Sequence, residues 1–120
     1  MNLIANAFVT LVALLHIYFF VLEMFLWTKP LGMKIFRMSQ DKANETKTLA
    51  ANQGLYNSFL AAGLIWGLIH PFPELAVQIK FFFLSCVVIA GIYGAYSVNR
   101  RIFFIQSTPA ILALVLTWLA

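Results

Sequence analysis

Four long stretches of the chain are almost entirely apolar, and polar connections separate them. They run over residues 3–27, 49–69, 75–97 and 102–119. Each is close to the roughly 20 residues that an α-helix needs to cross a hydrocarbon core of about 30 Å. None alternates apolar with polar positions, as a membrane β-strand would. The pattern therefore predicts an all-α protein, a four-helix transmembrane bundle.

Composition supports lipid as the solvent for much of the chain. Hydrophobic residues make up 62% of the 120 residues and charged residues only 10%. A typical soluble domain is about 25% charged. So few charges cannot cover a water-exposed surface, and the length suits one domain. We therefore expect residues 1–120 to form a single integral-membrane domain.

The basic residues lie almost entirely in two of the connections. Because Lys and Arg are enriched in cytoplasmic loops, both connections are expected in the cytoplasm and both termini outside. This topology gives a longer basic cytoplasmic loop between the first and second helices. Lys80, early in the third helix, is expected to snorkel outward. The loop residues are Lys29, Lys34, Arg37, Lys42 and Lys47 in the first connection, and Arg100 and Arg101 in the second.

The first connection also carries helical signals. Leu31, Ile35 and Met38 recur at helical spacing and predict a short helix in the membrane interface. Ser39 or Asp41 is a candidate N-cap for the second membrane helix. Attraction to anionic membrane lipids explains the basic charge of this loop. We therefore expect lipids, and no nucleic acid, as partners.

The polar side chains inside the apolar stretches gather toward their cytoplasmic ends. At a rise of about 1.5 Å per residue they lie roughly 4–17 Å from that side. This asymmetry predicts a polar pocket that opens to the cytoplasm or to the inner leaflet. The ligand-binding candidates are His16, Glu23, Asn52, Gln53, Asn57, Tyr93 and Gln106.

These side chains need partners because hydrocarbon offers none. Glu23 points most clearly to function, since an acid inside a membrane helix is costly and is usually functional. The amides have a simpler interpretation as an interhelical hydrogen-bond network that fixes packing. His16 alone is more typical of a packing histidine, and Tyr93 of a residue in the interface belt.

The sequence favours a protein that is not an enzyme. His16 with Glu23 falls short of the three protein ligands that catalytic zinc needs. Cys86 is the only cysteine and is typical of a small packing residue. The chain shows no nucleophile–base triad, phosphate-binding glycine loop or catalytic carboxylate pair. We therefore assign no catalytic residue and expect no metal and no cofactor.

Several longer stretches resemble a known family. They are HIYFFVLEMFLWTKPLG from residue 16, ETKTLAANQGLYNSFLAAGLIWGL from residue 45, AGIYGAYSV from residue 90 and FIQSTPAILAL from residue 104. Together they are similar to a bacterial family of small four-helix membrane proteins filed as domain of unknown function 1304. The resemblance covers nearly the full length and implies a multi-pass protein of the bacterial cell (inner) membrane.

A fainter similarity is to the membrane-associated proteins of eicosanoid and glutathione metabolism. Those proteins are four-helix trimers with a cytoplasmic-side active site and a polar, Asn-containing stretch at the start of their second helix. Ala51, Asn52 and Gln53 are comparable with that stretch. The arginine that binds glutathione in that family has no counterpart at residues 48–60, which argues against glutathione chemistry.

Three functional hypotheses remain open. The first is binding or handling of an amphipathic small molecule or lipid in the polar pocket. The second is a small proton-coupled exporter that works as an oligomer through Glu23. The third is a packing-only scaffold, intolerant of changes at Gly63, Gly91 and Gly94. Four helices leave little room for a closed cavity, which favours a homo-oligomer, dimer or trimer.

Overall fold

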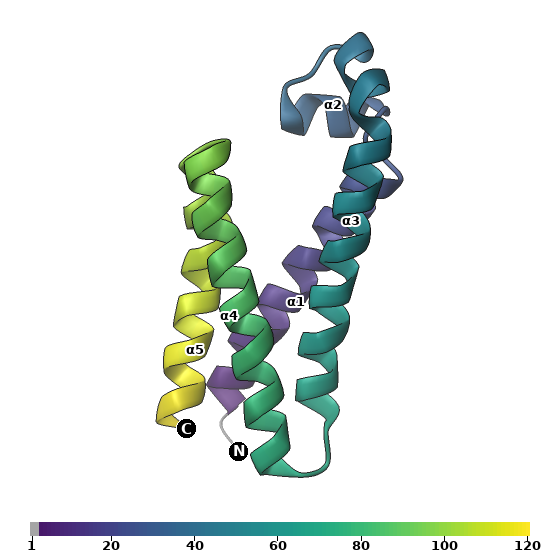
Figure 1. Ribbon diagram of the computed structural model, residues 1–120. Coiled ribbons are helices and arrows are strands. Elements are labelled where there is room, and N and C mark those ends of the chain that lie inside the picture. The colour runs from purple at the N-terminus through teal and green to yellow at the C-terminus, as the bar shows by residue number, and fades with distance from the viewer. Residues whose placement is uncertain (1–2) are drawn as a thin grey trace. The chain divides into compact units, whose positions relative to one another are not determined.

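The computed structural model describes residues 3–120, and this part of the chain is built from helices (Figure 1). In chain order they are α1 (Leu3–Met24), α2 (Pro30–Phe36), α3 (Gln40–Ile69), α4 (Pro73–Ser97), the π-helical η1 (Phe103–Ser107) and α5 (Thr108–Leu119). Residues 3–120 contain no β-strand. The all-α prediction is therefore confirmed.

Helix boundaries differ from the predicted ones where polar groups or prolines act on the helix ends. α3 begins at Gln40, well before its apolar part, because Ser39 Oγ accepts a hydrogen bond from the Lys42 N–H at 3.2 Å. α4 begins at Pro73, since the first helical turn does not need the N–H that proline lacks. The turn between α3 and α4 therefore consists of residues 70–72.

Two helices are long and apolar enough to cross a membrane, Leu3–Met24 and Pro73–Ser97. A third, shorter apolar helix covers Phe103–Leu119. α3 has the length, but its first turns carry Asp41, Lys42, Glu45 and Lys47. Asn52, Gln53 and Asn57 then interrupt its apolar part, so α3 is the least apolar of the long helices.

The described chain forms two compact units. Unit 1 contains residues 3–15 together with Leu60–Ala120. Unit 2 contains His16–Phe59. Both unit boundaries fall inside helices, so α1 and α3 each contribute to both units.

Unit 1 has a core of small and branched apolar side chains. The core draws on α1, α3, α4 and α5, and its members are almost completely excluded from solvent. Small residues at several of these positions let the helix backbones approach closely. The buried set is Val9, Val12, Ala13, Leu64, Leu84, Val87, Ala110 and Ala113.

α4 and the η1–α5 segment lie side by side along their length (Figure 1). A Cβ added to Gly91 would collide with Ser107 Oγ, so glycine is needed for this approach. Ser107 Oγ donates a hydrogen bond across the interface to the Val88 carbonyl at 2.9 Å. Gly94 plays the same role farther along, where Ile102 fills the space.

The π-helical turn η1 comes directly before Pro109. Its last hydrogen bond runs from the Thr108 N–H to the Phe103 carbonyl, five residues back. Proline has no N–H for the carbonyl four residues before it, which disturbs the ordinary α-helical ladder. The sequence predicts a kink at this place, and the structure resolves the disturbance into a π-turn, one of the recognised causes of kinks.

In unit 2, the short helix predicted from Leu31, Ile35 and Met38 is α2, but its last residue is Phe36, so Met38 lies outside it. Pro30 opens it, and Arg37 ends it in the left-handed conformation with φ 55°. Trp27, before the helix, packs on Phe36 with ring centroids 4.7 Å apart. Its indole Nε1–H also donates to Thr46 Oγ1 at 3.0 Å. Trp27 therefore ties α2 to the first half of α3.

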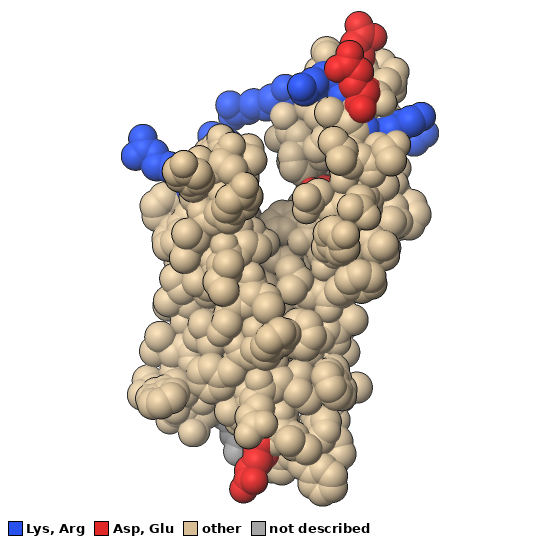
Figure 2. Space-filling model, in the orientation of Figure 1, with Lys and Arg blue, Asp and Glu red and all other residues tan. Residues whose placement is uncertain are grey.

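Charged side chains lie at helix ends in each unit. In unit 2 the Lys and Arg side chains gather around α2 and the beginning of α3 (Figure 2). In unit 1, Arg100 and Arg101 follow α4, while Glu74 lies in its first turn. The visible face of α4 between these ends carries no basic group (Figure 2).

Candidate functional site

Glu23 and Asn57 form a direct side-chain pair within unit 2. Asn57 Nδ2 donates a hydrogen bond to Glu23 Oε1. Glu23 comes from the last turn of α1, Asn57 from the middle of α3, and both side chains are half-buried. Two of the predicted ligand-binding candidates, one from each of two helices, are therefore in direct contact.

Gly54 brings the two helices close enough for this contact. It lies one turn before Asn57 on α3 and is buried against α1. A Cβ added at Gly54 would lie 3.1 Å from both Glu23 Cβ and the Met24 backbone nitrogen, and 3.2 Å from the Phe20 carbonyl oxygen. Any larger side chain at this position would press the helices apart at the pair.

The pair is rich in acceptors. A carboxylate offers about four lone-pair sites, and Asn57 fills one of them. Within residues 3–120, no Lys, Arg or His side chain makes an ion pair with Glu23. The Asn57 side-chain oxygen adds another acceptor beside the carboxylate. Such an arrangement is suited to a hydrogen-bond donor or a cation.

The other predicted residues of unit 2 are arranged differently. Asn52 and Gln53 are exposed on α3, one turn from Asn57. His16 is fully buried and packs edge-on against Phe19, with ring centroids 5.5 Å apart. It lies about 10 Å from Glu23 along the helix axis. His16 is therefore a core residue, whereas Asn52 and Gln53 border the pair.

Tyr93 and Gln106 belong to unit 1. Tyr93 is 68% exposed on α4, and Gln106 is half-buried in η1. The side chain that η1 buries against α4 is Ser107, next to Gln106. Ser107 lies on one helical stripe with Ala110, Ala113 and Thr117, so small-residue periodicity is the signal that identifies it.

The prediction for Lys80 was wrong. Its side chain is only 7% exposed and does not snorkel outward. Its ammonium donates a hydrogen bond to Asn6 Oδ1 of α1 at 3.0 Å. The partners are 74 positions apart in the chain, and no local pattern connects them.

Residues 10–118 match the family described as "Protein of unknown function (DUF1304)". The chain belongs to this DUF1304 family. It is also 31% identical over 107 residues to the "Uncharacterized protein YpaA" of Lactococcus lactis subsp. lactis (strain IL1403), with 88% of each chain covered. No solved structure matches the chain. The resemblance expected from the sequence is thus confirmed.

This DUF1304 chain therefore has two polar features inside largely apolar helices. One is the Glu23–Asn57 pair of unit 2, an acceptor-rich site. The other is the Lys80–Asn6 pair of unit 1, which carries the opposite charge. The two pairs therefore suit ligands of opposite charge.

Proposed function

We propose that this protein is a multi-pass protein of the bacterial cell (inner) membrane that binds an amphipathic small molecule at Glu23 and Asn57. In this proposal α1, α3, α4 and η1–α5 are the four crossings, with both termini outside. The apolar character of the helices and the basic connections at residues 29–47 and 100–101 support it. The Glu23–Asn57 pair then lies on the cytoplasmic side.

The single observation that carries the proposal is the pairing of the Glu23 carboxylate with the Asn57 amide. An acid near the end of an apolar helix costs free energy, on the order of 2.5–3.5 kcal/mol at the bilayer centre and less toward the interface. One neutral amide offsets only part of that cost. A pair of amides would be enough for a packing role, so the presence of a carboxylate favours a bound ligand.

The acceptors define the polar end of that ligand. The unused lone pairs of Glu23 and the Asn57 oxygen favour a molecule that donates hydrogen bonds, above all a primary amine. Exposed apolar side chains on the same stretch of α3 supply contact for its tail. They are Leu55, Tyr56 and Phe59.

The test uses the protein in lipid nanodiscs and three probes of equal chain length: dodecylamine, dodecanol and dodecanoate. A ligand that binds only the folded state stabilises it, by about 2.7 kcal/mol at 100 times its Kd. This stabilisation raises the melting temperature. We expect dodecylamine to stabilise the wild type most, and Glu23→Gln to lose that preference.

Glu45→Gln is the matched control, because it removes the same charge from an exposed position on α3. It should respond to the amine as the wild type does. An equal response of Glu23→Gln and the wild type to dodecylamine would refute the proposal.

A second function uses the same carboxylate. Glu23 has no basic partner within residues 3–120, so it is able to exchange a proton for a cationic substrate, as a proton-coupled exporter does. Proteoliposomes separate the two functions. Export predicts amine-driven proton movement that Glu23→Gln abolishes, whereas binding alone predicts none.

A further inference from the structure

Lys80 is turned into unit 1 by the packing of its own stem. A Cβ added at Gly67 of α3 would lie only 2.6 Å from Lys80 Cγ, so the lysine stem fills the space that glycine leaves. The ammonium then reaches Asn6 Oδ1 at 3.0 Å. A lysine at this level of an apolar helix usually extends along the surface to water. Here it does not, and the charge remains inside.

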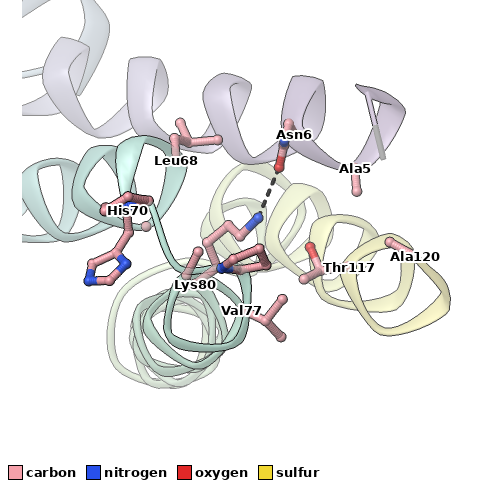
Figure 3. Close-up of a pocket in the computed structure, with 12 residues that line it drawn as sticks. Ala5, Asn6, Leu68, His70, Val77, Lys80, Thr117 and Ala120 are labelled. Carbon is pink, nitrogen blue, oxygen red and sulfur yellow. Dashed lines mark hydrogen bonds between the residues drawn. The ribbon is translucent and has the colours of Figure 1, made fainter. Parts of the chain in front are cut away.

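The ammonium faces an open cavity of about 280 Å³. α1 contributes Asn6 to its lining, α4 contributes Lys80, and α5 contributes Thr117 (Figure 3). Figure 3 shows the Thr117 hydroxyl on the side of the cavity where Lys80 and Asn6 lie. Most of the remaining lining is apolar, and none of the described lining residues has an acidic side chain.

The Thr117 hydroxyl is the second, independent sign of a ligand. Thr117 is 5% exposed, and its oxygen has no hydrogen-bond partner among residues 3–120. Helical Ser and Thr usually donate to the carbonyl four residues back. Thr10, Thr46 and Ser97 of this chain all do so, at 2.7–2.8 Å. Thr117 instead leaves its hydroxyl to the cavity.

Lys80, Asn6 and Thr117 bring side-chain donors to the cavity. Lys80 has three N–H bonds and uses one on Asn6. Asn6 accepts that bond through its oxygen, which leaves its amide N–H groups as donors. His70 also lines the cavity, but its ring points away from Lys80 in Figure 3, and its Nδ1 accepts the Phe72 N–H at 3.1 Å. An oxyanion is the chemical complement of this donor set.

We propose that the cavity around Lys80 binds a phosphate ester group, with the Lys80 ammonium and the Thr117 hydroxyl as its principal donors. A phosphate offers several oxygens, enough to meet donors from three helices. The group belongs either to an anionic lipid headgroup or to a soluble phosphate ester. The proposal rests on unit 1 alone and is independent of the function proposed for Glu23.

The experiment measures binding to the full-length protein in phosphate-free detergent by native mass spectrometry. The probes are phosphatidylglycerol, diacylglycerol with the same acyl chains, and glycerol 3-phosphate. We expect phosphatidylglycerol to bind at least tenfold more tightly than diacylglycerol. Lys80→Met should remove at least tenfold of this affinity, and Lys80→Arg should keep it within threefold.

Thr117→Val keeps the shape of the side chain and removes the hydroxyl, so it tests the site without removing the charge. It should weaken phosphatidylglycerol binding at least threefold, while Thr117→Ser restores it. Lys34→Met removes an exposed lysine of unit 2 and should change nothing. Circular dichroism melts identify variants that fail to fold. If Lys80→Met fails to fold, phosphatidylglycerol binding by Thr117→Val becomes the test of the site.

Each outcome separates the sources or rejects the site. Binding of phosphatidylglycerol without glycerol 3-phosphate assigns a lipid headgroup, and binding of glycerol 3-phosphate assigns a soluble ester. Equal binding of phosphatidylglycerol and diacylglycerol would overturn the proposal, as would no binding of either phosphate probe. Full binding in folded Lys80→Met, or in folded Thr117→Val, would also overturn it.

Discussion

Glu23 and Asn57 show how one hydrogen bond depends on both of its partners. The amide of Asn57 gives the half-buried carboxylate a donor that no basic side chain of residues 3–120 supplies. Removing one partner leaves the other buried without a bond, which costs more than the net value of the bond itself. Replacing both partners by apolar groups avoids that penalty.

We therefore predict that Asn57→Leu lowers the free energy of unfolding by about 1–3 kcal/mol. The double variant Glu23→Leu/Asn57→Leu should recover most of this loss, because no orphaned polar group remains. Equilibrium unfolding in SDS, followed by circular dichroism, measures the difference. Asn52→Leu, an exposed amide on the same helix, should change little. If Asn57→Leu matches Asn52→Leu, the bond contributes nothing to stability.

The surroundings of some polar residues can be predicted from the sequence and those of others cannot, for clear physical reasons. An acid and amides in apolar helices must find partners, so the sequence selects Glu23 and Asn57 as polar-site residues, but it does not pair them with each other. The inward direction of Lys80 is not predictable, because it depends on Gly67 and on Asn6, which are distant in the chain. In η1 the sequence favours the larger amide of Gln106, yet the helix stripe buries Ser107.

At the level of elements, α4 packs closely on the segment that contains η1 because Gly91 faces Ser107 and Gly94 faces Ile102. Ser107 packs against Gly91 in the space that a side chain at position 91 would fill. The Ser107 hydroxyl donates a hydrogen bond to the Val88 carbonyl. Close packing and a polar bond therefore occur at the same place, as expected of helix pairs in a membrane.

Gly91→Ala should destabilise unit 1 by about 1–3 kcal/mol, the usual cost of overpacking a closed interface. Ser107→Ala in the same chain should recover only part of the loss, since the Ser107 backbone nitrogen would still lie 2.9 Å from the new Cβ. Thermal melts in one detergent provide the comparison. A Gly91→Ala melting curve identical to the wild type would show that the interface is looser than the structure has it.

The elements themselves follow largely from the apolar pattern. α1, α4 and η1–α5 together lie within about three residues of their predicted stretches, because long apolar runs permit few alternatives. The extension of α3 to Gln40 depends on the cap at Ser39, one of two candidates that the sequence offers. The π-form of η1 is different. Pro109 marks where the backbone hydrogen bonds of the α-helix are interrupted, but several helix distortions accommodate a proline equally well.

For the molecule as a whole, the central claim is four membrane crossings with the basic connections inside. The charge asymmetry gives the direction, since Lys and Arg dominate residues 29–47 and 100–101. Glu74 begins α4 at the opposite end from Arg100 and Arg101. The proposed topology accordingly puts Glu74 outside and Arg100 and Arg101 in the cytoplasm.

Cysteine labelling tests this claim most directly, because Cys86 is the only native cysteine. On a Cys86→Ser background, single cysteines replace Asn44, Glu74 and Val98, all exposed outside the apolar helix centres. A membrane-impermeant maleimide should label Glu74→Cys in cells whose inner membrane is intact, and Asn44→Cys and Val98→Cys only after that membrane is permeabilised. Labelling of Asn44→Cys in the intact cells, or of all three positions from one side, would contradict the four-crossing topology.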